Sequence, residues 1–352
     1  MFGRMMNNFY YGKSGKGDFR KEDLPKNRWQ LFWEMLRVRL SSLCRLNLMT
    51  IVAWLPLIIV LINFISTMFN IMMVTTEYQY YLSNGVVSET FTQEMADHLA
   101  EQGIADEAGI SAFIASVFFQ GLNSVLLWMI PAILITGPIQ AGVAHVTRNW
   151  SRDEHAFIWS DFKDAVKGNW KQALGISAIS SVVPILMYTC YTFYGDMANN
   201  NMLFLVPQML ILTLGAVWFL ACTFMYPLMV SYKMKFKALL KNGLMLAIAR
   251  LPHTIVIRLA ALVPALLCIV IFWFTGTIYA LLALLAYYVM IGFTMSRFIF
   301  ASFTNGIFDK YINSHIEGAK INRGIASDED DDDEDEEDSD PDQPLNSNYP
   351  NA

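Results

Sequence analysis

The stretch "ILITGPIQAGVAHVTRNWSRDEHAF", residues Ile133–Phe157, passes from an apolar run into a charged segment. The pair Gly137-Pro138 stands at the transition. Proline fixes φ, lacks an N–H and disfavours helix for the residue before it, so the pair predicts that a hydrophobic helix bends or stops here. Small residues such as Gly137 and Ala141 let a neighbouring helix approach closely. We interpret the block as an elbow that ends a membrane span and aims the segment His145–Ala173 along a membrane face.

The composition indicates a membrane protein. The chain has 352 residues, of which 55% are hydrophobic and 16% are charged, whereas soluble domains carry about 25% charged residues. The apolar residues form blocks near or above the roughly 20 residues that a membrane helix needs. The fold prediction is therefore all-α, a polytopic membrane helical bundle of about six transmembrane helices. We place the spans at Leu46–Val74, Phe113–Thr136, Ala173–Tyr194, Met202–Ser231, Thr254–Phe274 and Thr277–Met295.

The basic residues predict the orientation of the bundle. All 25 Lys and Arg fall before the first span, between the second and third, between the fourth and fifth, after the sixth, or at span ends on that same side. The positive-inside rule then places both termini in the cytoplasm, and we expect a multi-pass membrane protein. Arg258 and Arg297 lie within about a turn of this face. Their side chains either extend outward as anchors, which we favour, or line an ion pathway.

Four regions follow from these patterns. Of the 31 acidic residues, 13 lie in 328–342, and without them the formal charge of −6 becomes +7. Such a polyacidic segment lacks the apolar residues that would offset its ordering entropy, and we expect it to be solvated or to contact a basic partner or the protein's own basic face. The regions are a flexible basic N-terminal segment 1–28, an amphipathic interfacial helix 29–45, a six-span membrane domain 46–303 with an extracytoplasmic insert 75–112, and a cytoplasmic C-terminal segment 304–352 with a disordered acidic tail 327–352.

The insert 75–112 is predicted to contain a short amphipathic helix. The spacing Thr90-x-x-Gln93 matches a capping box, and Gly103 is a plausible C-terminal stop. We expect a loosely packed cap, with a partner-binding element as the alternative.

Chemistry-bearing residues are sparse in the predicted spans. No Asp, Glu, Lys or His lies near the middle of any span, which argues against a pump or a proton-coupled transporter. The chain has no H-E-x-x-H motif and no C-x-x-C pair. His145 and His155 suit interfacial loop positions better than a metal site. We therefore expect no catalytic residue, no cofactor and no metal.

Uncharged polar residues share a face in two spans. They hydrogen-bond between helices, or they line a shallow cavity open to the outside that suits a small polar solute such as a sugar; we favour the first interpretation. The candidate cavity residues are Asn63, Ser66 and Asn70 in the first span and Gln120 and Asn123 in the second.

Three stretches carry a resemblance to a known family. They are "RLNLMTIVAWLPLIIV" (Arg45–Val60), "WMIPAILITGPIQAGVAHVTRNWSRDEHAFIWSDFKDAVKGNWKQA" (Trp128–Ala173) and "LLKNGLMLAIARLPHTIVI" (Leu239–Ile257). Together they resemble the YesL-like family of bacterial multi-pass membrane proteins, a domain of unknown function. The residues that match are Asn47, Pro56, Thr136, Gly137, Pro138, Ala141, Phe162 and Pro252.

The resemblance implies a role beside bacterial carbohydrate-uptake systems and no active site. We expect a non-enzymatic accessory or regulatory protein whose partners are the lipid bilayer and components of a sugar ABC transporter, and no nucleic acid. The alternative is a solute transporter or channel for a small polar solute. The oligomeric state is not predicted.

Overall fold

The computed structural model describes residues 25–86, 91–101, 104 and 106–325. Every regular element in this part of the chain is helical, so the all-α prediction is confirmed. The elements are α2 (Arg28–Asn84), α3 (Gln93–Glu101), α4 (Glu107–Trp150), α5 (Ser160–Ala198), the short η2 (Met202–Phe204), α6 (Leu205–Ser231), α7 (Phe236–Ala249), α8 (Leu251–Thr275), α9 (Ile278–Tyr287), the π-helix η3 (Tyr288–Gly292), α10 (Phe293–Tyr311) and η4 (Asn313–His315).

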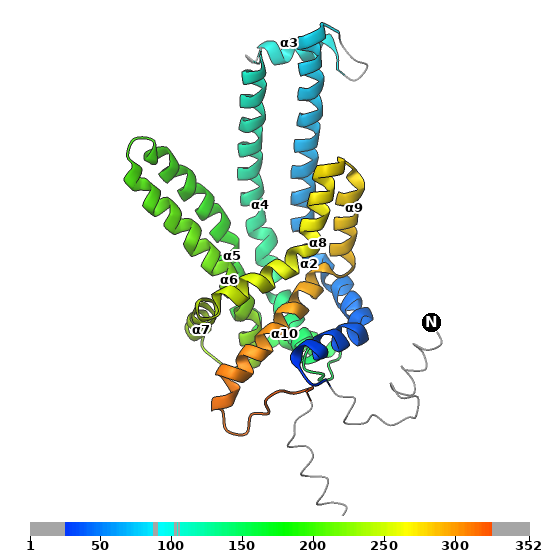
Figure 1. Ribbon diagram of the computed structural model, residues 1–352, viewed down its shortest axis with the longest axis vertical. Coiled ribbons are helices and arrows are strands. Elements are labelled where there is room, and N and C mark those ends of the chain that lie inside the picture. The colour runs from blue at the N-terminus through cyan, green and yellow to red at the C-terminus, as the bar shows by residue number, and fades with distance from the viewer. Residues whose placement is uncertain (1–24, 87–90, 102–103, 105, 326–352) are drawn as a thin grey trace, which may run out of the picture.

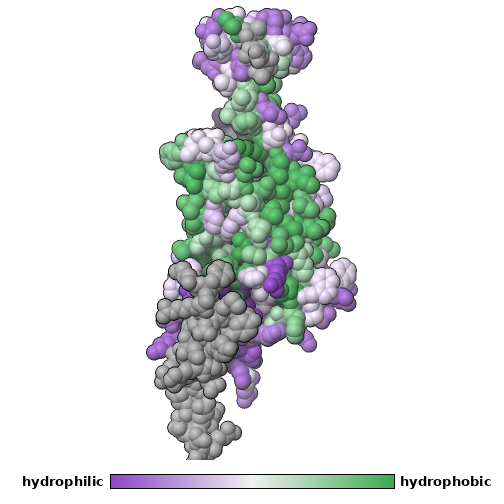
Figure 2. All heavy atoms as spheres, turned by 90° about the vertical axis from the view of Figure 1, so that its right-hand side faces the viewer, coloured by the Kyte–Doolittle hydropathy of each residue, from purple (hydrophilic) through white to green (hydrophobic). Residues whose placement is uncertain are grey.

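Six of the described helices are long and apolar enough to cross a membrane, which agrees with the six predicted spans. Figure 2 shows a broad band of hydrophobic side chains around the middle of the molecule, with hydrophilic side chains at the end that carries α3 and at the opposite end. The six segments are Arg28–Asn84, Glu107–Trp150, Ser160–Ala198, Met202–Ser231, Leu251–Thr275 and Ile278–His315.

The first two spans form a long antiparallel hairpin (Figure 1). With 57 residues, α2 extends over about 85 Å at 1.5 Å per residue, far beyond a hydrocarbon core of roughly 30 Å. Much of the insert 75–112 is therefore a continuation of α2 and α4. Only α3 and its short connections cap the far end of the hairpin.

The cap has a packed core of its own, so the expectation of a loosely packed cap is wrong. Tyr78, Phe91 and Ala96 are each 1% exposed, and they form one cluster with Leu99, Ile104 and Ile110. The hydroxyl of Tyr78 donates a hydrogen bond to the backbone oxygen of Ile104. Thr90 and Gly103, the predicted helix boundaries, lie outside the described residues.

The segment 29–45 is not a separate surface helix, because α2 begins at Arg28 and continues without a break. The side chains of Leu31, Met35 and Leu36 are buried, whereas those of Trp29 and Trp33 are 68% and 52% exposed. The segment is therefore amphipathic as predicted, but it is the first part of the first span.

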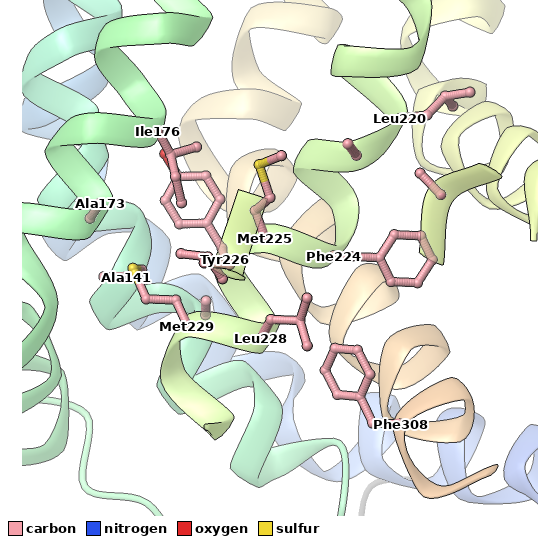
Figure 3. Close-up of a cluster of buried hydrophobic side chains, with 14 of the residues drawn as sticks. Ala141, Ala173, Ile176, Leu220, Phe224, Met225, Tyr226, Leu228, Met229 and Phe308 are labelled. Atoms are coloured by element: carbon pink, nitrogen blue, oxygen red, sulfur yellow. The ribbon is translucent and has the colours of Figure 1, made fainter. Parts of the chain in front are cut away.

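The remaining spans form two further hairpins, α5–α6 and α8–α9. Figure 1 shows α5–α6 spreading away from the α2–α4 hairpin and α8–α9 on the other side of the molecule, while α7, α10 and the first turns of α2 lie at the end opposite α3. This end also holds the C-terminus of α4 and the N-terminus of α5, and we call it the basic end because the described Lys and Arg residues concentrate in these segments. The largest core lies just above it, where α4, α5, α6 and α10 meet (Figure 3).

Arg258 and Arg297 turn toward α6 instead of extending outward. The Arg258 guanidinium donates to the hydroxyl of Thr223 (2.6 Å) and to the backbone oxygen of Phe219 (2.7 Å). The Arg297 guanidinium lies 4.6 Å from the ring centroid of Tyr226. These contacts tie α8 and α10 to α6, so outward anchoring, the expectation that we favoured, does not describe either side chain.

Candidate functional site

The block around Gly137 lies at the closest contact between α4 and α5. Helix α4 continues through Pro131 and Pro138 to Trp150, so of the two predicted outcomes at Gly137-Pro138, a bend or a stop, the stop does not occur. The chain changes direction at residues 151–159 instead. A Cβ atom on Gly137 would lie 2.2 Å from the Ser177 hydroxyl oxygen and 2.7 Å from the Ala173 backbone oxygen. Glycine is therefore required here by the approach of α5.

Pro138 creates a second contact at the same joint. In a regular helix its N–H would donate to the carbonyl of Leu134, four residues earlier, and proline has no N–H. The Ser177 hydroxyl of α5 lies 3.1 Å from that Leu134 oxygen and 3.0 Å from the Leu174 oxygen of its own helix. Since a hydroxyl carries one hydrogen, it is shared between these two acceptors. The buried carbonyl that Pro138 leaves without a donor thus finds one on the neighbouring helix.

The other small residues of the block serve the same interface. A Cβ atom on Gly142 would lie 2.4 Å from the ring of Phe162, which is buried against α4. Ala141 is fully buried, and Figure 3 shows it beside Met229 of α6. Thr136 is also fully buried and accepts a hydrogen bond from the Gln140 amide (2.8 Å). The block is a helix joint, which we call the α4–α5 joint: Thr136, Gly137, Pro138, Ala141, Phe162 and Ser177.

Asn47, another residue of the family resemblance, holds the break in the last span. Its side chain is fully buried, and its amide nitrogen donates to the backbone oxygens of Tyr288 (2.9 Å) and Val289 (2.7 Å). Its side-chain oxygen accepts from the backbone N–H of Thr294 (3.1 Å). A π-helix interrupts the regular hydrogen-bond ladder between α9 and α10. One buried side chain of α2 therefore satisfies three backbone groups at that interruption.

The remaining two residues of the resemblance lie apart from the joint. Pro56 is half-buried inside α2, and Pro252 lies exposed in the first turn of α8. The structure thus brings five of the eight residues together at the α4–α5 joint and distributes the other three over α2 and α8.

The five candidate cavity residues are all exposed on the surface of the α2–α4 hairpin. At this level the two helices meet through other side chains, because Phe64 and Met68 of α2 pack over Gly121 of α4. Neither of the two described cavities is lined by a candidate residue. The polar cavity stays a prediction, and the residues in question are Asn63, Ser66, Asn70, Gln120 and Asn123.

A cationic cavity of about 290 Å³ lies at the basic end, between the C-termini of α4 and α6 and the segment after α10. The turn after α4 contains a left-handed residue, Asp153 (φ 56°), and the Glu154 N–H donates back to the Asn149 oxygen (2.9 Å), as in a Schellman turn. This turn brings Glu154 beside Arg152 at the rim of the cavity. Arg148 lines it from the last turn of α4, Arg152 from the turn that follows, and Lys320 and Arg323 from the C-terminal segment.

The wall formed by the C-terminal segment is fixed by two ion pairs. Glu154 pairs with Arg323, and Asp309 pairs with Arg28 at 2.6 Å. The Asp309 carboxylate also accepts the backbone N–H of Asn322 (3.1 Å). The segment is therefore held against α4 and the start of α2.

Tyr232 separates this cavity from a second hollow of about 780 Å³ between α5 and the α6–α7 connection. Burial raises the pKa of Tyr232, so at neutral pH its phenol is a neutral donor, and it donates to the Asn313 side chain (2.7 Å). The second hollow adds Lys167, Lys171 and Lys233 to the same region. Within the part of the chain that the structure describes, no group of three or more His, Cys, Asp or Glu is arranged to hold a metal ion.

The α4–α5 joint is also where the chain matches a known family. Residues 119–191 match the family described as "Protein of unknown function, DUF624". The match covers about a fifth of the chain and spans most of α4, the connection and most of α5. It is consistent with the YesL-like resemblance and does not identify that family. No curated protein and no solved structure matches the chain at a significant level.

Two features of the site were not predicted from the sequence. Ser177 was not singled out, although a serine within a span that packs on a proline-containing helix is a signal for hydrogen bonding to a freed carbonyl. Arg148 and Arg152 were treated only as charges of a loop. Arg148 lies in the last turn of α4 and Arg152 in the turn that follows, and their closeness in sequence could have indicated a shared cationic surface.

Proposed function

We propose that this integral membrane protein is a non-enzymatic accessory subunit of a membrane system such as carbohydrate uptake, in the bacterial plasma membrane with both termini cytoplasmic. The observation that carries the proposal is the incomplete packing of its spans against one another. The orientation is supported by the basic end, and the link to carbohydrate uptake rests on the YesL-like resemblance.

The spans bury little of their apolar surface within the chain. In the most apolar 18-residue stretch of α2 and in that of α8, 6% of the residues are buried within the chain, and in that of the α6 span 17% are. Helices α8 and α9 contact chiefly each other and reach the rest of the chain through α6, α10 and the π-helix. Lipid tails accommodate such surfaces, and so do the helices of another membrane protein, which associate by close packing and interhelical hydrogen bonds.

The spread of the hairpins favours a protein neighbour. Figure 1 shows α5–α6 diverging from the α2–α4 hairpin toward the α3 end, while α8–α9 lies on the other side, where the π-helix after α9 packs on α2. The two larger cores lie toward the basic end, where parts of these hairpins pack against one another. Hairpins that are joined at one packed end leave apolar helix faces exposed, and such faces can pack against the transmembrane helices of a partner subunit.

Photocrosslinking in native membranes tests this proposal. We would place p-benzoylphenylalanine at Leu186 of α5 or Leu267 of α8, which are 55% and 56% exposed, and at Met95 of the cap as a matched position (38% exposed). We expect Leu186 or Leu267 to form an adduct with a membrane-spanning subunit of a sugar uptake system, identified by mass spectrometry, and Met95 to form none. Adducts with lipid alone at both span positions, in folded protein, would contradict the proposal.

The alternative role, a channel or carrier for a small polar solute, stays a prediction. Its proposed path runs along Asn63 and Asn70, which are exposed on α2. Flux of small sugars into proteoliposomes that is unchanged by Asn63→Leu combined with Asn70→Leu would exclude that path.

A further inference from the structure

We propose that the cationic cavity at the basic end binds an anion of the phosphate-monoester class. The cavity brings four basic side chains to one small space, and of its described lining residues only Glu154 is acidic. A small site with a few convergent polar groups is typical of ligand recognition. The charges come from separate parts of the chain, α4 and the segment after α10, so the fold assembles them.

Two of the arginines are held without full hydrogen-bond partners. The Nε atoms of Arg148 and Arg152 are buried and make no hydrogen bond to a described residue. That of Arg152 is left with an ion pair to the Glu154 carboxylate at 3.6 Å. The Arg152 side chain is also nine-tenths buried, since the residue is 8% exposed. A buried donor of a charged group is costly when it lacks an acceptor. An anion in the cavity would supply acceptors to both side chains.

The spacing of these arginines sharpens the argument. Like charges held close together repel each other, and Arg148 has both Arg152 and Arg323 close enough to act on its charge. Glu154 provides one negative charge, which it divides between Arg152 (3.6 Å) and Arg323. An excess of three positive charges therefore remains at the cavity.

The N–H donors of the guanidinium groups suit the oxygen atoms of a phosphate group. Guanidinium groups present paired N–H donors that match phosphate and carboxylate oxygens, and a phosphate monoester carries between one and two negative charges at neutral pH. Tyr232 and Asn313 also line the cavity, and the Tyr232 hydroxyl donates a hydrogen bond to the Asn313 side chain. Both side chains are polar and uncharged. At about 290 Å³ the cavity accepts a small phosphorylated compound or the headgroup of a lipid such as phosphatidic acid.

Calorimetric titration of the full-length protein separates these two sources. One arm uses glycerol 3-phosphate with the protein in dodecyl maltoside micelles, and glycerol is the uncharged control. The other arm compares nanodiscs containing phosphatidic acid with nanodiscs of phosphatidylcholine alone. We expect saturable binding of one equivalent of the phosphate monoester in at least one arm. Binding only in the nanodisc arm identifies a lipid headgroup, and binding only in micelles identifies a soluble ligand; either supports the site.

Three variants locate the binding. Arg152→Gln should weaken the affinity at least tenfold, and Lys320→Gln, at an exposed rim position, should weaken it about threefold without disturbing buried residues. Lys163→Gln removes the same charge from an exposed position of α5 that lines neither cavity, and it should leave the affinity unchanged. The proposal is overturned by a lack of saturable binding in both arms, or by an equal loss of affinity in Lys163→Gln and Lys320→Gln.

Discussion

The hydroxyl of Ser177 lies 3.1 Å from the carbonyl oxygen of Leu134, the group that Pro138 leaves without a helical donor. This relationship joins α5 to α4 in the part of the chain that matches a known family. It explains why Gly137 and Pro138 occur together: the glycine removes the Cβ atom that would block Ser177, and the proline frees the carbonyl that Ser177 then satisfies.

The coupling between Ser177 and Pro138 is testable by a double-mutant cycle. Ser177→Ala should lower the free energy of unfolding by about 1–2 kcal/mol, because a buried carbonyl loses its donor. In a Pro138→Ala background the backbone N–H is restored, so the same Ser177→Ala change should cost roughly 0.5 kcal/mol or less. Thermal unfolding in detergent micelles measures both values. Equal costs of Ser177→Ala in the two backgrounds would show that the hydroxyl does not serve the Leu134 carbonyl.

A methyl group at Gly137 should open the α4–α5 joint. Gly137→Ala places an atom against the Ala173 backbone oxygen, which cannot rotate away, and overpacking of this kind costs about 1–3 kcal/mol. Removal of the hydroxyl in Gly137→Ala with Ser177→Ala should not restore stability. Gly137→Leu should prevent accumulation of folded protein. The matched control is Gly168→Ala at an exposed position of α5, where no neighbouring atom lies within 4 Å of the new methyl group. This change should raise the free energy of unfolding by about 0.5–1 kcal/mol.

Asn47 should contribute strongly to stability. Asn47→Leu keeps the side-chain volume but leaves two backbone oxygens and the Thr294 N–H without partners in a buried position, for a loss of roughly 2–5 kcal/mol in the free energy of unfolding. Asn63→Leu, at an exposed position of the same helix, should change stability by less than about 0.5 kcal/mol. A comparable loss in the two variants, measured by thermal unfolding in the same detergent, would refute a special role for Asn47.

The polyacidic segment should weaken anion binding at the basic end. Asp328 follows Arg323 by five residues, a tether of at most about 17 Å, so thirteen acidic residues start close to the cationic cavity. Deletion of 328–342 should raise the affinity for glycerol 3-phosphate about threefold or more at low salt, and salt near 1 M should abolish the difference because it shortens the Debye length to about 3 Å. Calorimetry at both salt concentrations provides the measurement.

Deletion of 343–352 is the matched control for that experiment. These ten residues follow the acidic segment and carry no charged side chain, so their removal should leave the affinity unchanged at both salt concentrations. An identical increase after either deletion would assign the effect to chain length and not to charge.

Several features were predictable because they depend on local composition. The six apolar blocks predicted six spans, since a segment of that length and polarity requires a hydrocarbon environment. Gly137 and Ala141 predicted a close helix contact, because small side chains let a neighbouring backbone approach. The structure places α5 against Gly137.

Other features were not predictable because they depend on partners distant in sequence. The stop at Pro138 did not occur, because Ser177, 39 residues later, offers the hydrogen bond that lets α4 continue. Arg258 did not extend outward, because Thr223 and Phe219 of α6 provide acceptors within the bundle. The cap is packed because α2 and α4 extend far enough for Tyr78 and Ile110 to meet around Phe91.

The sequence by itself determined that this is a helical membrane protein with one basic side, because hydropathy and charge act on each segment independently of the others. Only the tertiary structure decided that Gly137-Pro138 is a joint inside a continuous helix, that Asn47 completes a broken span, and that Arg148, Arg152 and Arg323 share one cavity. Each of these depends on a group from a distant segment reaching hydrogen-bond or ionic contact, and contact is a property of the assembled helices.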